Sequence, residues 1–173
     1  MLHGRFRLGV GSGENLNEHV LGDPWPRPCI RLEMLEEAIE VMRKLWGGGQ
    51  VSYEGDYFVV DTARLYSLPE EPPPVLMSAF GPAAVKLAAR VADGYVGTKP
   101  NRELLERYRA EGGKGPKLGG LKVCWAEDEE RHVAAIRQYL DAGYDGVYLQ
   151  QMGKDLQGFL RFYRDEVEPR LGL

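Results

Sequence analysis

Two short stretches of the sequence repeat one pattern and restrict the folds that the chain can adopt. Residues 91–97 read VADGYVG and residues 142–149 read AGYDGVYL. In each stretch a helical segment ends, an Asp-Gly pair follows, and an apolar run of strand length begins. Helices that alternate with apolar strands are typical of β/α units, whose strands lie parallel in one sheet. The repeat therefore predicts an α/β fold.

The rest of the chain extends the pattern to about five strands. They are predicted to begin near residues 6, 75, 94, 121 and 146, with helices over 30–46, 82–92, 101–113, 130–143 and 156–171. Apolar runs of this kind suit strands that are buried on both faces. We therefore expect a partial TIM-type (β/α) barrel, in which functional residues lie on the loops that follow the strands.

One segment interrupts the alternation. Residues 51–60, VSYEGDYFVV, predict a small β-hairpin about the turn Glu54-Gly55-Asp56, and the Pro-rich PEEPPP that follows predicts a rigid extended linker. We interpret residues 47–74 as a hairpin and Pro-rich insertion within a single (β/α) domain that spans residues 1–173.

Composition narrows the function classes. At 173 residues and 43% hydrophobic content, the chain is large enough to bury a core as one soluble domain. A balance of 22 basic and 26 acidic residues offers no electrostatic footprint for nucleic acid. No apolar run reaches the length of a membrane span, and the first residues, MLHGRFRLG, lack the long apolar stretch of a signal peptide, so we expect a cytoplasmic protein. Small-molecule chemistry or protein contact remains. Cys29 and Cys124 lack metal-ligand spacing and are expected to be small buried residues, so no metal is predicted.

The first predicted strand ends in a glycine-rich loop, GVGSGENLNEH at residues 9–19. Its spacing lacks the third glycine of the dinucleotide fingerprint and the Gly-Lys-Ser/Thr of a P-loop. Glycines such as Gly13 permit a sharp turn and a close approach to a ligand, which would leave Glu14 and Asn17 at the barrel mouth as proton donor and orienting group. Alternatively, Glu14 is a solvated loop residue and Asn17 caps a helix.

Two later loops carry further candidates. In Ser78-Ala79-Phe80-Gly81-Pro82 a strand turns directly into a helix, whose free N–H groups could bind a phosphate, although the same residues could serve only to begin the helix tightly. After the next strand, Thr98 and Lys99 could offer a hydroxyl and a cation to an anionic group, although a loop lysine is often merely solvated.

Several stretches together resemble the luciferase-like monooxygenase superfamily, and within it the oxidoreductases of the glucose-6-phosphate dehydrogenase type that use the deazaflavin coenzyme F420. They are RFRLGVGSGENLNEH, RLEMLEEAIEVMRKLW, ARLYSLPEEPPPVLMSAFGP, VADGYVGTKP, KVCWAEDE and ERHVAAIRQYLDAGYDGVYLQQMG with FLRFYRDEV. The resemblance spans nearly the whole chain in the family's order. It implies a TIM-type barrel that binds F420 and transfers a hydride to or from its C5.

The resemblance also implies roles for the candidates. Glu14 looks like the family's acidic active-site residue, and Asn17 is similar to the polar residue beside it. Ala79, Phe80, Gly81 and Pro82 match the turn whose backbone holds the cofactor phosphate, and we assign the adjoining Ser78 and Gly13 to cofactor binding as well. Thr98 resembles a residue at the anionic end of the substrate, and Lys99 lies next to it.

The chain departs from the family in two places. It begins at what resembles the family's fourth strand, so the three strands whose histidine, aspartate and aromatic residues face the deazaflavin ring are absent. A second gap falls in WAEDE|ERHV, where the family has a helical extension with basic residues for a substrate phosphate. Two alternatives to an F420-dependent oxidoreductase follow: an inactive half-barrel remnant that mainly oligomerises, and a relative that uses FMN.

Five strands cannot close a barrel that needs eight, so the strands near residues 6 and 146 are predicted to be open edges. We therefore expect a homo-oligomer, with a homodimer as the simplest form. Six side chains are also expected to point inward and to lose the packing of a full barrel: Leu8, Val10, Val75, Met77, Val123 and Val147.

Overall fold

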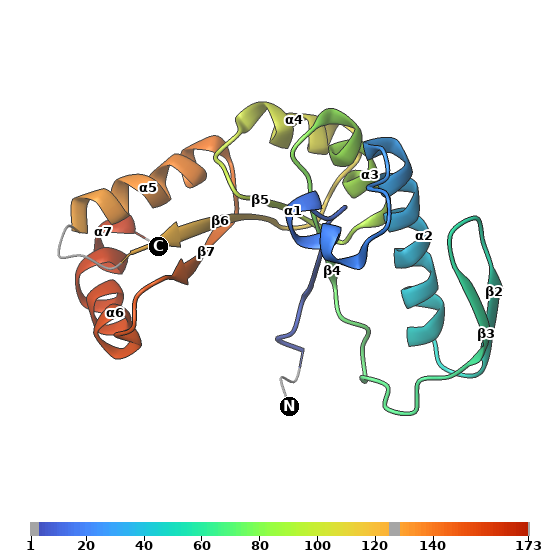
Figure 1. The fold of residues 1–173 in the computed structure, drawn as a ribbon. Coiled ribbons are helices and arrows are strands. Elements are labelled where there is room, and N and C mark those ends of the chain that lie inside the picture. Colours follow the sequence, from blue (N-terminus) through green and yellow to red (C-terminus); the bar gives the residue numbers. More distant parts are fainter. Residues whose placement is uncertain (1–3, 125–128, 173) are drawn as a thin grey trace.

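The fold is that of a computed structural model, which describes residues 4–124 and 129–172. Its main element is a sheet of five parallel strands in the order β1-β4-β5-β6-β7. These are β1 (Leu8–Val10), β4 (Val75–Ser78), β5 (Gly94–Gly97), β6 (Lys117–Val123) and β7 (Gly146–Gln151). The sheet curves into an arch, so the predicted partial barrel is confirmed (Figure 1).

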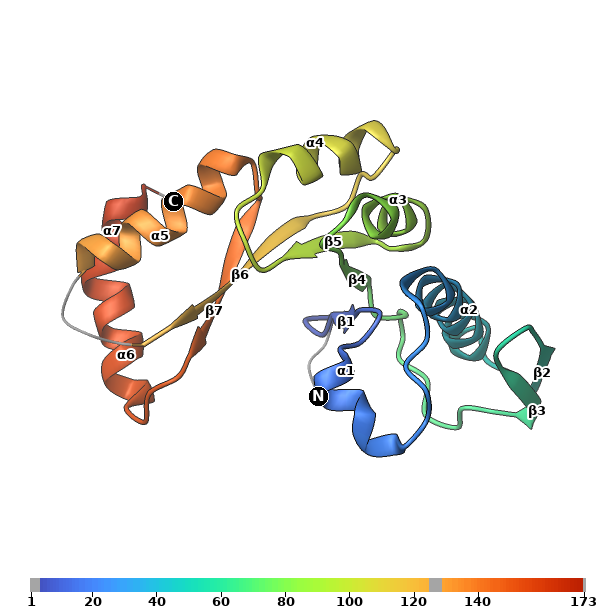
Figure 2. The ribbon, with the colours of Figure 1, turned by 45° about the horizontal axis from the view of Figure 1, so that its top comes forward.

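Helices follow the strands. They are α1 (Asn15–Glu18) with the short turn η1 (His19–Leu21), α2 (Pro28–Trp46), α3 (Pro82–Val91), α4 (Arg102–Ala110), α5 (Glu129–Ala142), α6 (Leu156–Phe162), the π-helical turn η2 (Tyr163–Val167) and α7 (Glu168–Leu171). The longer helices α2, α3, α4 and α5 cover the outer, convex face of the arch, whereas α1, which has no buried residue, lies in the loop after β1 (Figures 1 and 2). The last predicted helix is thus divided into three pieces, and Pro169 stands in the first turn of the third.

The repeated Asp-Gly pair has the same structural role in both units. The Asp93 carboxylate accepts from the Val75 N–H at 2.8 Å, and the Asp93 N–H donates to the Val75 carbonyl at 2.8 Å. Asp145 does the same with Lys117, again at 2.8 Å for both bonds. Each aspartate therefore fastens the first residue of the neighbouring strand, which explains the repeat seen in the sequence.

The glycine of the first pair leaves room for a leucine on the neighbouring strand, because a Cβ on Gly94 would lie 2.6 Å from Leu76 Cδ2. In the second pair a Cβ on Gly146 would lie 3.5 Å from Leu118 Cδ2, which is an ordinary van der Waals contact. Leu76 pairs with Gly94 and Leu118 with Gly146 in the strand register. Both leucines lie on the inner, concave side of the sheet, opposite the helices.

The core lies between the outer face of the sheet and the helices. Met77, Val85, Leu105 and Tyr108 are fully buried in it, and a second cluster joins α5 to η2 through Ile136 and Val167.

The expectation that Leu8, Val10, Val75, Met77, Val123 and Val147 point inward is wrong. Met77 belongs to the core under the helices, and Val10 and Val147 pack against that core. The remaining three share their face by the alternation of side chains along a strand. The concave face instead carries side chains such as Leu76, Val96, Leu118 and Tyr148, as the register of β4 to β7 shows.

The predicted hairpin forms as β2 (Val51–Glu54) and β3 (Val59–Ala63) in a separate two-stranded antiparallel sheet. It lies beside α2, at one end of the arch (Figure 1). The Glu37 carboxylate on α2 accepts from the backbone N–H groups of Asp56, Tyr57 and Phe58 at 2.7 to 3.2 Å. This one carboxylate holds the tip of the hairpin against the helix.

Two local expectations differ from the structure. β6 begins at Lys117, four residues before the predicted start, because Lys117 and Leu118 pair with β5 and β7. Cys29 and Cys124 are exposed rather than buried, since one lies in the first turn of α2 and the other directly after β6.

Candidate functional site

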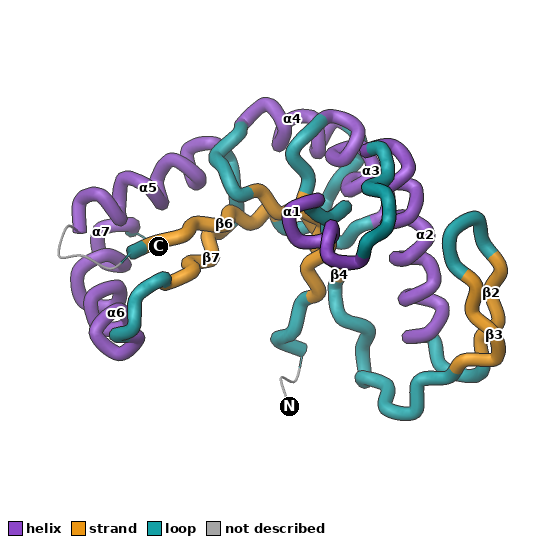
Figure 3. Tube along the Cα trace, in the orientation of Figure 1, coloured by secondary structure: helices purple, strands orange, loops and turns teal. Residues whose placement is uncertain are grey.

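All five strands are parallel, so their carboxyl ends lie along one edge of the sheet. Figure 3 shows the strands and the loops that join them to the helices. The loops after β1, β4 and β5 carry the residues that the sequence predicts for a site. In a β/α barrel this edge is where ligands bind. The described parts of these three loops therefore define the candidate site.

The loop after β1 presents Glu14 as the N-cap of α1. Its backbone carbonyl accepts from the N–H groups of Asn17 and Glu18 at 3.0 and 3.1 Å. Its extended backbone (φ −131°, ψ 130°) leaves the carboxylate exposed and not bonded to the helix. Asn17 lies inside α1 and is exposed, so the alternative in which Asn17 caps the helix is wrong.

Arg31, from the first turns of α2, holds this loop from behind. Its Nη1 donates to the carbonyls of Ser12 and Gly13, each at 3.1 Å. The guanidinium carbon lies 4.6 Å from the centre of the Trp25 ring, a cation–π geometry. Sequence reasoning missed both residues, because contacts between positions 19 apart arise only when α2 folds back against the loop.

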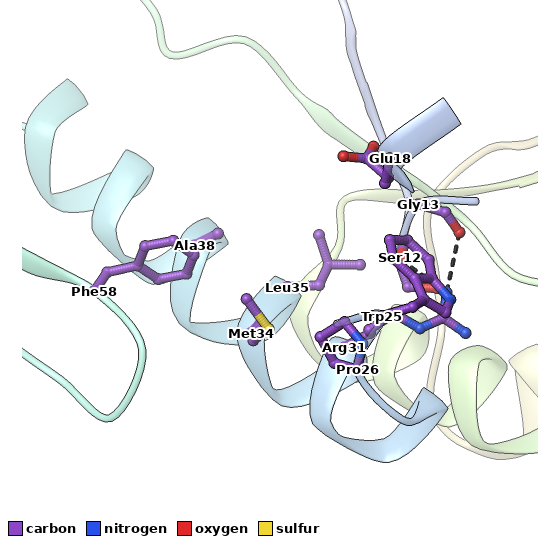
Figure 4. A pocket seen from close by; sticks show the side chains of 11 residues that line it. Ser12, Gly13, Glu18, Trp25, Pro26, Arg31, Met34, Leu35, Ala38 and Phe58 are labelled. Carbon is purple, nitrogen blue, oxygen red and sulfur yellow. Dashed lines mark hydrogen bonds between the residues drawn. The ribbon is translucent and has the colours of Figure 1, made fainter. Parts of the chain in front are cut away.

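A pocket of about 260 Å³ lies between this loop, α2 and the hairpin tip (Figure 4). Its polar groups come from Ser12, Glu18 and Arg31, and Trp25, Met34, Leu35 and Phe58 supply apolar walls. The pocket is separate from the turn after β4, which contributes no residue to its lining.

The turn after β4 joins the strand directly to α3. Ala79 is buried, and its carbonyl accepts from the Tyr95 hydroxyl at 2.8 Å. Burial, with a smaller contribution from Tyr144, raises the pKa of Tyr95, so this hydroxyl is protonated at neutral pH and donates. Gly81 is the N-cap of α3 and Pro82 follows it, while the Phe80 side chain is 62% exposed. The first N–H groups of α3 therefore lie at the carboxyl edge of the sheet, with no side chain capping them.

After β5, Thr98 and Lys99 are exposed. The carbonyl of Lys99 accepts from the Tyr144 hydroxyl at 2.9 Å, which fixes the backbone at this position. Burial raises the pKa of Tyr144 above its ordinary value, so it also donates at neutral pH.

The loops after β1 and β4 lie side by side, since a Cβ on Gly11 would be 3.7 Å from the Ser78 Cβ. This places Gly13 and Glu14 near the turn at residues 78–82. Thr98 and Lys99 follow on the next strand, because β4 pairs with β5.

The register brings together Gln150, which follows the last strand predicted from the sequence, and two polar groups that sequence reasoning missed, Lys122 and Tyr148. Lys122 pairs with Gln150, and Tyr148 covers Gly120, where a Cβ would lie 2.3 Å from the Tyr148 hydroxyl. The neighbours Leu121 and Leu149 pack against the helix side, so Lys122, Tyr148 and Gln150 face the concave side. A lysine inside the apolar run GLKV was the available signal.

Over residues 4–124 and 129–172, no three His, Cys, Asp or Glu side chains gather in a way that could hold a metal ion. Over the same residues, no helix is long and apolar enough to cross a membrane.

A parallel (β/α) half-barrel whose strand-end loops meet at one edge defines this chain as a TIM-barrel-type protein. The sequence profile of the luciferase-like monooxygenases matches residues 1–170. The chain belongs to the luciferase-like monooxygenase family.

Its relatives include F420-dependent enzymes. An F420-dependent glucose-6-phosphate dehydrogenase of Nakamurella multipartita is 30% identical over 235 residues, covering 99% of this chain and 69% of the relative. The enzyme of the same name from Gordonia bronchialis is 43% identical over 148 residues, covering 82% of this chain and 40% of the relative. A solved F420-dependent secondary alcohol dehydrogenase in complex with an F420-acetone adduct has a TM-score of 0.84 at 22% identity, covering 97% of this chain and 70% of that one.

The chain is shorter than these relatives. It spans 69% of the first relative, and the aligned region of 235 residues exceeds the 173 of the chain, so the relative has additional residues inside that region. From the sequence, such a gap is expected in WAEDE|ERHV, and residues 125–128 lie outside the described part of the chain.

Proposed function

We propose that the chain is an F420-dependent oxidoreductase, which transfers a hydride between C5 of the deazaflavin and a small alcohol, aldehyde or sugar-type substrate. The observation that carries the proposal is the meeting of the Gly11–Glu14 loop with the Ser78–Pro82 turn at the carboxyl edge of the sheet. The names of the F420-dependent relatives support the choice of cofactor.

The turn after β4 suits a phosphate-bearing cofactor. The N-terminus of α3 offers backbone N–H groups and a positive dipole end, which attract anions. A Cβ built on Gly81 meets nothing within 4 Å, so the space beside these groups is open. Ser78, Ala79, Phe80, Gly81 and Pro82 would hold the phosphate, and Gly13 and Asn17 would lie against the same cofactor from the neighbouring loop.

F420 would supply the hydride acceptor or donor. Glu14 would exchange the proton: when an alcohol is oxidised, the hydroxyl proton passes to the Glu14 carboxylate as the hydride leaves the carbon. Thr98 and Lys99 would bind an anionic end of the substrate through a hydroxyl and an ammonium group. Their place on the strand next to the turn at residues 78–82 supports this division of roles.

A second candidate is an inactive half-barrel that mainly oligomerises. It is favoured by the two sheet edges: within the described residues, β1 pairs only with β4, and β7 only with β6. The concave face is also exposed, with Tyr148 at 47% exposure, and a second copy of the chain could cover it.

Titration of the purified chain with F420 and separately with FMN tests these candidates. Saturable F420 binding, together with reduction of F420 by 2-propanol or glucose 6-phosphate, supports the proposal. Preferential binding of FMN would favour a flavin-dependent relative. Binding of neither cofactor would leave the inactive half-barrel.

A further inference from the structure

The position of the Glu14 carboxylate depends on the backbone that carries it. Within residues 4–124 and 129–172, this side chain has no hydrogen bond or ion pair. Nothing in that part of the chain therefore fixes the carboxylate directly. Where it lies follows from the path of residues 11–14.

Among the side chains that the structure describes, Arg31 donates hydrogen bonds to the backbone of residues 11–14. Its Nη1 donates to the Gly13 carbonyl at 3.1 Å and to the Ser12 carbonyl at 3.1 Å. Because a peptide group is planar, the Gly13 carbonyl oxygen lies in one plane with the nitrogen and Cα of Glu14. Fixing that oxygen therefore fixes the origin of the Glu14 side chain.

Trp25 completes the support. Its ring lies 4.6 Å from the Arg31 guanidinium carbon, and its Cη2 lies 3.0 Å from where a Cβ on Gly13 would stand. Gly13 adopts φ +75°, a conformation that L side chains rarely adopt. The loop thus passes through a turn that only glycine accommodates easily, between Trp25 and the bonds from Arg31.

The helix that carries Arg31 packs against the core. α2 has 19 residues, and Leu32 and Leu35, next to Arg31 on the helix, pack against the main core. The guanidinium therefore has a fixed base from which to hold the loop.

We propose that Arg31 is a positioning residue for Glu14: it holds the Ser12 and Gly13 carbonyls so that the Glu14 carboxylate stands where a proton is exchanged. This rests on the proposed oxidoreductase function. It assigns to α2 a part in the reaction, although no residue of α2 needs to touch substrate or cofactor.

The first test measures the loop without any cofactor. Arg31→Met keeps the aliphatic stem and removes the donors, and Arg43→Met makes the same change near the other end of α2, where Arg43 binds Asp93. Hydrogen exchange followed by mass spectrometry should show amides of residues 11–18 exchanging at least about fivefold faster in Arg31→Met only. Residues 82–91 should be unchanged. Equal exchange of residues 11–18 in wild type and Arg31→Met overturns the proposal.

The second test measures coupling to Glu14. Wild type, Arg31→Met, Glu14→Gln and the double variant are compared in F420 reduction by 2-propanol or glucose 6-phosphate. Arg31→Met should lower kcat about tenfold to a hundredfold, the cost of a misplacement near 1 Å, and change the F420 dissociation constant less than about twofold. In the Glu14→Gln background it should cause no further loss.

The two failures can be told apart. Equal losses of kcat in both backgrounds would show that Arg31 acts through general stability, and would overturn the positioning role. A wild-type chain without F420 turnover contradicts the proposed function, and the exchange experiment then still decides whether Arg31 orders the loop.

Discussion

The hydrogen bonds that tie Asp93 to Val75 and Asp145 to Lys117, here called the Asp-Gly clamps, predict a loss of stability when either aspartate is removed. Asp145→Ala deletes the acceptor for the Lys117 N–H at 2.8 Å and the ion pair with Lys117 Nζ at 2.7 Å. A hydrogen bond to a charged group contributes about 1.5 to 3 kcal/mol, and a solvent-exposed ion pair about 0 to 1 kcal/mol. The Asp145 side chain is 49% exposed, so water replaces part of both contacts. We expect a loss of about 2 kcal/mol, or about 4 to 8 °C in Tm.

The pH dependence has a defined sign. Partial burial alone would raise the pKa of Asp145, but the hydrogen bonds and charge of Lys117 outweigh it and lower the pKa below the ordinary value of 3.8. A carboxylate whose pKa is lower in the folded state contributes stability above its unfolded pKa and loses it as the pH falls through the folded pKa. Asp145→Asn keeps an acceptor oxygen but loses the charge. Its deficit relative to wild type should be constant between pH 7 and pH 5 and should shrink below about pH 4.

Urea unfolding followed by circular dichroism measures both effects. Asp141→Ala, an exposed aspartate on α5, serves as the control and should leave the free energy of unfolding within about 0.5 kcal/mol of wild type. An unchanged midpoint in Asp145→Ala at pH 7, or a deficit of Asp145→Asn that stays constant down to pH 3, would refute the clamp.

Three further predictions concern the site and the sheet edges. Glu14→Gln should lower turnover at least about tenfold and leave F420 affinity nearly unchanged, because the amide cannot exchange the proton. Steady-state rates and F420 titration measure the two quantities. Equal turnover of the variant and wild type would show that Glu14 does not exchange the proton. Gly81→Val should weaken F420 binding about tenfold, because the valine side chain crowds the N-terminus of α3. The Tm should shift by only a few degrees, because φ is −143° and a Cβ at this position has space. An unaltered dissociation constant would contradict the phosphate site. Light scattering at micromolar concentration should give a mass of about twice the 19.4 kDa of one chain, because the backbone groups at the β1 and β7 edges lack strand partners within the described residues. A mass of one chain, together with cooperative unfolding, would show that the half-barrel is stable alone.

The sequence predicts the fold well where a local pattern has one physical meaning. The Asp-Gly repeat predicts parallel β/α units because the aspartate of each pair bonds to the first residue of the neighbouring strand. The sequence also predicts the hairpin at residues 51–63, since two runs of strand-forming residues flank a turn that contains a glycine. The candidate loops were found because a parallel sheet places every strand-end loop on the same edge.

Other features depend on tertiary contacts that no local pattern contains. Alternation shows that Val75 and Met77 share a face but not which face, and the structure places them under the helices. Glu14 rather than Asn17 caps α1, a choice between two residues that both begin a polar segment. Arg31 and Trp25 gain their roles only when α2 packs behind the loop, so their importance is invisible in the sequence.

The three loops of the candidate site are held in the same way. In each loop a side chain from elsewhere in the chain donates a hydrogen bond to a backbone carbonyl: Arg31 to Gly13, Tyr95 to Ala79, and Tyr144 to Lys99. The two tyrosine hydroxyls are buried and protonated at neutral pH, so these bonds persist over the physiological range. Arg31 lies on α2, Tyr95 on β5, and Tyr144 between α5 and β7, so all three donors belong to the five β/α units of this chain. The bonds that order the loops therefore form without a closed barrel. Weak F420 binding by this chain would therefore reflect few contacts to the deazaflavin ring rather than disordered loops, and the contribution of the phosphate turn, measured by Gly81→Val, should remain.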